Sequence, residues 1–330
     1  MLTLSALVSL EVLIGQRPTQ RTTPMFFTTT ASRRRALATV ASITALLTIS
    51  ACSNSDADAG KSKSGVDTSD IKVDTNAQGL LPADIKGAGK LTVAAALDYP
   101  PFDYVEDGKN KGFDIDLINT LAATLGLKVD LIRVPFDGQI AGLTANRFDV
   151  AMATFTVTPE REKEVDFVKF LTTGSVISVL GGTDLEKSIS TTEDLCGHSV
   201  AVIAGSSSQA LIPGLQKACE TAGKPEIDEQ AFQNQSSTVM AVINGRVDAK
   251  IDDATTSSYV SEQAGGKVVD VGEVFAPAPA GLAVGKDDPE LKVALEAALQ
   301  TLRDNGTYAE LLDKWGQSKN AYNPEGAPAS

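Results

Sequence analysis

The fold is decided by residues 91–126, which read LTVAAALDYPPFDYVEDGKNKGFDIDLINTLAATLG. Residues 91–96 are an unbroken run of small and apolar side chains, which is typical of a buried strand. Pro100 and Pro101 end that strand, because proline lacks the N–H group that a helix or a strand uses. Apolar positions at helical spacing follow, and they are Leu117, Ile118, Leu121, Ala122 and Leu125. Gly126 suits the position after the last helical residue, so the stretch predicts strand, loop and helix.

The same alternation continues along the chain in two similar units. Further strands are predicted at residues 129–134, 148–153, 199–204 and 249–252. Helices are predicted at 139–145, from 205–208 onward, at 239–244, and on both sides of Gly306 within 288–315. Alternation of strands and helices predicts an α/β fold with parallel strands.

Length and charge limit the classes of function. A chain of 330 residues is long enough for two domains that each bury a core. The formal net charge is −13, whereas binding to nucleic acid phosphates needs a basic surface. We therefore expect no nucleic-acid partner.

The N-terminal region predicts export. Arg33, Arg34 and Arg35 precede an uncharged apolar run at residues 36–48, and Cys52 follows small residues. A basic segment, a short apolar core and small residues describe a secretory signal peptide, and the run is too short to span a bilayer. Cys52 after Ser-Ala resembles a lipobox, which predicts acylation of Cys52; an ordinary signal peptide with an incidental Cys is the alternative.

The residues before the basic segment are less typical of an exported protein. Residues 1–24 do not fit a signal sequence, so we expect a natural start at Met25, and Arg33 and Arg34 leave twin-arginine export open beside the general route. We assign 1–51 to the signal peptide region and 52–85 to the lipidated Cys and a flexible tether, because residues 53–85 are polar and lack apolar periodicity.

Two cysteines remain after Cys52, and they are Cys196 and Cys219. Outside the cytoplasm an even pair is expected to be oxidised, with two free buried thiols as the alternative. His198 is the only histidine, and no cluster of ligand residues accompanies it. We therefore expect neither a metal site nor a cofactor.

Five short motifs resemble, in order, the polar amino-acid family (family 3) of extracellular solute-binding proteins from bacterial ABC transporters, with the actinobacterial lipoprotein type indicated by the cysteine pair. The motifs cover roughly residues 88–318, and the matching positions are 99–102 (YPPF), 112–117 (GFDIDL), 156–161 (TVTPER) with 165–167 (VDF), 245–249 (GRVDA), and 306–308 (GTY) with 314–316 (KWG). Each motif alone is short, and their common order carries the resemblance.

The resemblance implies a two-lobed clamp of the type II periplasmic-binding-protein fold with two hinge crossings. Lobe 1 is expected at 86–178 plus 280–320, lobe 2 at 179–279, and a polar tail at 321–330. The implied function is capture of an amino acid or similar small zwitterion by a monomer anchored outside the cell membrane, and delivery to the permease of an ABC importer.

The resemblance also implies a set of ligand contacts. Arg161 would hold the α-carboxylate, because a guanidinium matches a carboxylate with two parallel hydrogen bonds. The N–H of Ser207, beside Ser206 at a helix start, would be a second donor; capping of the helix by serine is the alternative, and both can hold. For the ammonium, the family uses an acid, here Asp253 although Asp252 is adjacent, together with the carbonyl of Ala153 and a hydroxyl of Thr154 or Thr156.

The side-chain pocket is less well defined. Tyr99 and Phe136 would form its walls, with core packing as the alternative for both. Relatives that bind basic amino acids often carry an acid three residues before the tyrosine, where this chain has Ala96. Asp98 is nearby but is expected to cap the turn, so a cationic ligand side chain is disfavoured.

Two other classes of function were weighed. Some relatives on this fold are dehydratases, but the sequence shows no nucleophile with a base beside it. A ligand-sensing lipoprotein that serves a signalling partner is the third class. We expect a binding protein and no enzyme.

Overall fold

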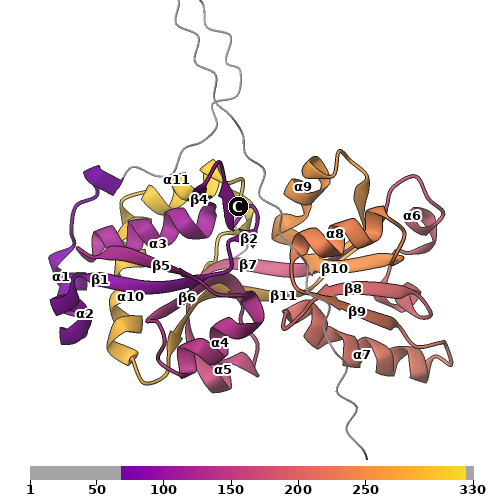
Figure 1. The fold of residues 1–330 in the computed structure, drawn as a ribbon, viewed down its shortest axis with the longest axis horizontal. Coiled ribbons are helices and arrows are strands. Elements are labelled where there is room, and N and C mark those ends of the chain that lie inside the picture. The colour runs from indigo at the N-terminus through magenta and orange to yellow at the C-terminus, as the bar shows by residue number, and fades with distance from the viewer. Residues whose placement is uncertain (1–67, 325–330) are drawn as a thin grey trace, which may run out of the picture. The chain divides into compact units, whose positions relative to one another are not determined.

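The computed structural model describes residues 68–324, and these contain one eight-stranded sheet with helices on both of its faces (Figure 1). The strand order is β5-β1-β6-β11-β7-β10-β8-β9. The bounds are β1 Lys90–Ala95, β5 Lys128–Arg133, β6 Val150–Thr156, β7 Val165–Leu180, β8 Ser199–Ile203, β9 Asp228–Phe232, β10 Ala249–Asp253 and β11 Val268–Gly285. Strands β1, β5 and β6 are parallel, and so are β8, β9 and β10.

Two long strands, β7 and β11, connect the two halves of this sheet. They pair antiparallel with each other from Val268 opposite Leu180 to Gly285 opposite Val165. The first end of β7 lies beside the β1–β5–β6 half, which we call lobe 1, and its other end pairs with β10 of the β8–β9–β10 half, which we call lobe 2. The chain thus crosses between the lobes twice, as a two-lobed clamp requires.

The helices that cover lobe 1 come from the N-terminal part and from the C-terminal part of the described residues. They are α1 Thr75–Gly79, α2 Ala83–Ala88, α3 Phe113–Thr124, α4 Phe136–Thr144, α5 Arg161–Glu164, α10 Pro289–Asp304 and α11 Thr307–Lys314, with short 3-10 turns at Thr68–Asp70 and Ser318–Asn320. Helix α10 places its buried leucines in the same core as Phe102 and Phe113. Thr301 in α10 donates to Asp74 before α1 at 2.6 Å.

A small antiparallel sheet positions the loop that follows β1. It consists of β2 Asp98–Tyr99, β3 Asp103–Glu106 and β4 Lys109–Lys111. Gly112 then begins α3 at φ +131°, and a Cβ there would collide with the carbonyl of Phe102. Asp116 in α3 accepts from Lys314 Nζ and Trp315 Nε1, each at 2.8 Å. The chain's second and last motifs therefore meet in lobe 1.

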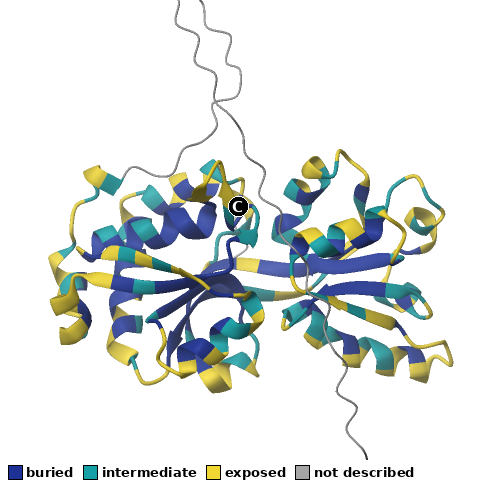
Figure 2. Cartoon of the chain, in the orientation of Figure 1, coloured by how far each residue is buried: buried dark blue, intermediate teal, exposed yellow. Residues whose placement is uncertain are grey.

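Lobe 2 has its own core and its own helices. They are α6 Leu185–Ser188, α7 Ser207–Thr221, α8 Gln235–Ile243 and α9 Ala254–Gln263, with a 3-10 turn, η2, at Thr192–Leu195. Val200, Val202 and Ile251 on its strands are buried against Ile212 of α7. Figure 2 shows the resulting pattern, with buried central strands and exposed outer helix faces.

Two of the expected boundaries are wrong. Residues 75–85 are not part of a tether, because they lie in α1, in α2 or between them, and Ala77, Leu81 and Ile85 are buried in the lobe 1 core. The expected tail from 321 also begins too early, since Ala321 pairs with Leu171 and the N–H of Tyr322 donates to the carbonyl of Phe170.

The signal peptide, Cys52 and residues 53–67 of the expected tether lie outside the described residues, and so do residues 325–330. Between residues 68 and 324, no helix is both long enough and apolar enough to cross a membrane.

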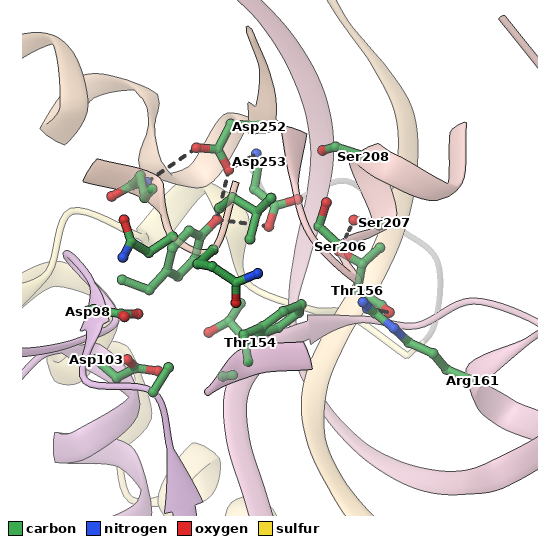
Figure 3. Close-up of a pocket in the computed structure, with 18 residues that line it drawn as sticks. Asp98, Asp103, Thr154, Thr156, Arg161, Ser206, Ser207, Ser208, Asp252 and Asp253 are labelled. Carbon is green, nitrogen blue, oxygen red and sulfur yellow. Dashed lines mark hydrogen bonds between the residues drawn. The ribbon is translucent and has the colours of Figure 1, made fainter. Parts of the chain in front are cut away.

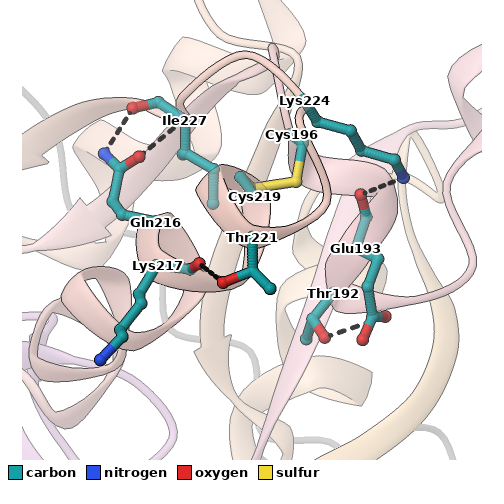
Figure 4. Close-up of a disulfide and its surroundings, with 9 residues drawn as sticks. All are labelled: Thr192, Glu193, Cys196, Gln216, Lys217, Cys219, Thr221, Lys224 and Ile227. Carbon is teal, nitrogen blue, oxygen red and sulfur yellow. Dashed lines mark hydrogen bonds between the residues drawn. A yellow bond between two sulfur atoms is a disulfide. The ribbon is translucent and has the colours of Figure 1, made fainter.

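Cys196 and Cys219 form a disulfide in lobe 2 (Figure 4). Cys196 follows η2, and Cys219 lies in the last turn of α7, so the bond fastens the helix to the segment before β8. The side chain of Cys219 is buried in the lobe 2 core. The two cysteines are 23 residues apart, and closing a loop of this length removes entropy from the unfolded chain.

Replacement of both cysteines, Cys196→Ser with Cys219→Ser, should lower the free energy of unfolding by about 3 kcal/mol. The measurement is urea denaturation of the oxidised protein and of the variant. Reduction of the unmutated protein should reproduce the loss, and equal midpoints for all three samples would show that the bond contributes nothing to stability.

Candidate binding site

A pocket lies where the two lobes meet, at the carboxyl ends of strands from both (Figure 3). Loops at such strand ends are where open α/β sheets bind ligands. The lining comes from β2, β6, α4 and α5 of lobe 1 and from β8, α7, α8 and β10 of lobe 2. The lining residues are Ala96, Asp98, Tyr99, Asp103, Phe136, Ala153, Thr154, Thr156, Arg161, Ile203, Ser206, Ser207, Ser208, Gln233, Asn234, Gln235, Asp252 and Asp253. All nine expected ligand contacts are among them.

Arg161 is held at the lobe boundary by bonds to both lobes. Its guanidinium donates to the carbonyl of Thr156 at 2.7 Å and, across the boundary, to the carbonyl of Gly205 at 2.9 Å. The same group lies over the rings of Phe136 and Phe155, 5.6 and 5.4 Å from their centres. Burial lowers the pKa of Arg161, but guanidinium remains charged at any ordinary pH. The pocket therefore has one fixed positive charge.

The start of α7 lies beside this charge. Ser206 caps the helix, because its hydroxyl accepts from the N–H of Gln209 at 3.1 Å. Ser207 donates through its hydroxyl to Thr156 Oγ1 at 3.1 Å, which links α7 to the end of β6. Both lining positions are thus explained without a ligand, and the helix start still adds positive potential on the Arg161 side.

The end of β6 carries three of the expected contacts of lobe 1. Thr154 has φ +42°, a conformation that side chains rarely adopt, and its hydroxyl donates to Asp114 at 2.6 Å. Its hydrogen is therefore used within the protein. Ala153 and Thr156 flank it in the pocket wall. Burial raises the pKa of Asp114 to about 7.

Tyr99 and two acids of β10 form the opposite side of the pocket. The Tyr99 hydroxyl lies 3.1 Å from Asp252 Oδ1 and 3.0 Å from Asp253 Oδ2, so it bridges the lobes. Burial, and next the charge of Asp252, raise the pKa of Asp253 to about 7. Tyr99 is therefore more than the pocket wall that we expected.

Phe136 lines the pocket from the start of α4 and stacks on Phe155, with ring centres 5.2 Å apart. Phe136 therefore both lines the pocket and packs against another ring. The guanidinium of Arg161 lies over both rings of this pair.

Asp98 and Asp103 form a second acidic end of the pocket, which was not expected from the sequence. Asp98 belongs to strand β2 and lines the pocket, although we expected it to cap a turn. Burial raises its pKa, and Arg133 opposes the rise. Asp103 accepts from the N–H of Leu97 at 2.7 Å, while its Oδ2 has no hydrogen-bond partner among the described residues. The acid in the YPPFD stretch was the signal that could have revealed this end.

Among the described residues, neither the histidine nor a metal-binding group of side chains is found at the pocket. His198 lies 3.3 Å from Asp248 at the start of β8 and is not among the lining residues. Across residues 68–324, no three His, Cys, Asp or Glu side chains are grouped so that they could hold a metal ion.

Comparisons with known proteins define the class. Residues 91–318 match the model of the bacterial extracellular solute-binding proteins, family 3, so the chain belongs to this family. The arginine-binding protein ArgT of Corynebacterium glutamicum is 30% identical over 241 residues, 72% of this chain and 78% of ArgT. The L-cystine-binding protein TcyJ of Escherichia coli is 28% identical over 70% of this chain and 84% of its own length.

Solved structures agree with this class of fold. An ancestral arginine-binding protein bound to arginine is 36% identical, with a TM-score of 0.62, and the match covers 69% of this chain and 98% of that one. The ancestral amino acid-binding protein AncCDT-1, a precursor of cyclohexadienyl dehydratase, is 33% identical with a TM-score of 0.64 over 70% and 97%. The resemblance inferred from the motifs and the two-lobed fold are confirmed.

Replacement of Arg161 by alanine should weaken ligand binding by about 100-fold or more, because a charge-assisted bidentate contact would be lost. Isothermal titration with the ligand measures the change. Arg147→Ala is the matched control, since Arg147 is exposed and outside the pocket. Undiminished affinity in folded Arg161→Ala protein would exclude Arg161 from ligand binding.

Proposed function

We propose that this solute-binding protein captures an α-amino acid with a cationic side chain and delivers it to the permease of an ABC importer. The single observation that carries the choice of ligand is the excess of acids over bases around the pocket. It includes Asp98, Asp103, Asp252 and Asp253, against Arg161 in the lining, the buried Lys250 behind it, and Arg133, which acts on Asp98 from outside the lining.

The amino-acid backbone of the ligand would use the fixed charges near the lobe boundary. Arg161 and the start of α7 suit a carboxylate, because both present donors and positive potential. Asp253 suits the ammonium on the lobe 2 side. The positive charge of Arg161 would thus pair with the carboxylate of the ligand, and the negative charge of Asp253 with its ammonium.

The remaining charge balance favours a cation. Lys250 pairs with Asp252 at 2.9 Å, and burial raises the pKa of Asp103 well above its usual value. Asp98 is therefore the acid of this end that carries the charge, and the one base that acts on it, Arg133, is not among the lining residues. Even at an effective dielectric constant of 20, a unit charge about 4 Å from a carboxylate gains about 4 kcal/mol before desolvation. A cationic group at this end would therefore bind more tightly than a neutral group of equal shape.

This proposal reverses the expectation drawn from Ala96. The acid that relatives carry at that position is absent, but the turn beyond it brings Asp98 and Asp103 to the same pocket. Arginine-binding relatives such as ArgT support the choice, whereas the cystine-binding TcyJ is a reminder that the family also takes other amino acids.

Binding without catalysis is part of the proposal. The only histidine of the chain is engaged with Asp248 outside the pocket lining, so the pocket lacks an imidazole base. AncCDT-1, the structural neighbour that is a precursor of a dehydratase, is itself an amino acid-binding protein.

We further propose that the protein is a monomer anchored by acylated Cys52 to the outer face of the cell membrane. The basic segment, apolar run and Cys52 support this location, and the family is extracellular by description. Cys52→Ala should release the protein from the membrane fraction into the medium. Fractionation with an antibody measures this, and retention of the variant would exclude the anchor.

The ligand proposal is tested by a pair of molecules that differ in charge but hardly in shape, L-arginine and L-citrulline. We expect arginine to bind at least about 10-fold more tightly, equivalent to about 1.4 kcal/mol. Titration calorimetry of the purified protein measures both affinities. Equal affinities, or preference for citrulline, would contradict the cationic ligand.

Asp98→Asn should reduce the preference for arginine over citrulline by about 10-fold, because one opposite charge is lost while the shape is kept. Asp107→Asn is the matched control, since Asp107 lies in the exposed β3–β4 turn at φ +51°, a conformation that Asn adopts readily. An unchanged preference in Asp98→Asn would place the cation elsewhere.

A further inference from the structure

A buried lysine lies behind the ammonium end of the pocket. Lys250 on β10 is 2% exposed, and its Nζ lies 2.9 Å from Oδ2 of Asp252, which is 4% exposed. Burying an ammonium is costly unless it is paired, so the two charges must be present together. Lys250 itself is not among the residues that line the pocket.

Asp252 is surrounded by hydrogen-bond donors. Its Oδ2 accepts from Lys250 and, at 3.4 Å, from the amide of Gln235, while its Oδ1 accepts from the N–H of Asp253 at 2.8 Å. A carboxylate with such partners is stabilised in its charged form. Asp252 therefore carries the negative charge that Lys250 compensates.

The Tyr99 hydroxyl has only one hydrogen to give, yet it lies within hydrogen-bond distance of Asp252 Oδ1 and Asp253 Oδ2. One of these two contacts therefore needs a hydrogen from the carboxyl side. With Asp252 charged, the arrangement that satisfies both contacts has Tyr99 donating to Asp252 and a protonated Asp253 donating to Tyr99.

The groups that face Asp253 support this assignment. They are Asp252 and Lys250 on its own strand, Tyr99 from β2, and Arg161 from α5. Burial and then the charge of Asp252 raise the pKa of Asp253 to about 7. The charges of Arg161 and Lys250 oppose this rise, and so does the hydrogen bond that Tyr99 donates when Asp253 is ionised. Burial and the two nearby acids raise the pKa of Tyr99 well above its usual value, so the phenol keeps its hydrogen.

We infer that Lys250 is a positioning residue: it fixes the negative charge on Asp252, so that the exchangeable proton of the subsite lies on Asp253 and is released when a ligand ammonium binds. The step is balanced. The ammonium arrives with three N–H donors, the O–H bond of Asp253 breaks, its electron pair stays on the carboxylate, and the proton passes to solvent. This inference rests on the proposed binding of an α-amino acid at Asp253.

Proton release is measured by titrating L-arginine into the unmutated protein in two buffers of different ionisation enthalpy. With a pKa near 7 for Asp253, about 0.9 proton should be released per ligand near pH 6 and under about 0.1 near pH 8.5. The affinity should correspondingly fall about 10-fold from about pH 8 to about pH 6, because protonated Asp253 must first lose its proton. Binding with no dependence on the buffer near pH 6 would overturn the inference alone, whereas absence of arginine binding would overturn the proposed function with it.

Variants assign the proton and the role of Lys250. Asp253→Asn should bind more weakly and lose this release, and release equal to that of the unmutated protein would overturn the assignment. Lys250→Met should also lose the proton release. Without the charge of Lys250 beside it, Asp252 takes up the proton that leaves Asp253, so no proton passes to solvent. A lysine with a merely structural role would lower stability but leave the protons released per bound ligand unchanged, which would overturn its positioning role.

Two further variants keep the test decisive. Lys250→Arg preserves the positive charge and should retain the proton release. It replaces Lys250→Met as the test if that variant does not fold. Loss of the release in folded Lys250→Arg would contradict the proposed role of Lys250 in fixing the charge on Asp252. Lys217→Met is the matched control, since Lys217 is exposed on α7 in the same lobe. Its proton release should equal that of the unmutated protein.

Discussion

The pairing of β7 with β11 is the constraint on which the rest of the structure depends. These two strands run side by side from lobe 2 into lobe 1, so the lobes share one sheet while each keeps a separate core. Irregular pairing interrupts their ladder between Val271 and Ala278 and again between Ala280 and Gly281. Regular pairing at residues 268–271 and 281–285, with the irregular stretch between them, is an arrangement that holds the lobes in register and concentrates bending in that stretch.

The binding site follows from this arrangement. Strand β6 ends on one side of the crossing and β10 on the other, so Thr156 and Asp253 approach each other from different lobes. The contacts across the boundary are polar: Arg161 to the carbonyl of Gly205, Ser207 to Thr156, and Tyr99 to the acids of β10. Each uses polar groups of the kinds that bind carboxylates and ammonium groups, so the contacts that join the lobes lie where the proposed ligand would bind.

Much of this could be predicted from the sequence, for identifiable reasons. The strand before Pro100 and the helix at Leu117–Leu125 were visible as periodic patterns, and motif positions placed Arg161 and Asp253 in the pocket lining. Helix α1 was missed because it is five residues long and contributes only Ala77 to the core. A pattern of one apolar residue gives no periodicity to recognise.

The acids could not be placed for a different reason. Asp98 enters the pocket because β2 pairs with β3, a register that depends on tertiary structure rather than on local sequence. Lys250 was overlooked because a lysine within a strand is ordinarily assigned to the solvent side. Its burial is explained only by Asp252 two residues later, whose side chain points the same way along the strand.

The packing of α10 against α1 and α3 has a consequence for biosynthesis. Residues 289–304 supply six buried side chains to lobe 1, and Asp74 is bonded to Thr301, 227 residues away in the chain. A chain still emerging from the ribosome therefore lacks much of the first lobe's core until nearly all of it has been made. Lobe 2 lies within one continuous segment, but its disulfide joins only under oxidising conditions. Both lobes thus reach full stability late, lobe 1 when nearly all of its chain has been made and lobe 2 when its cysteines have been oxidised.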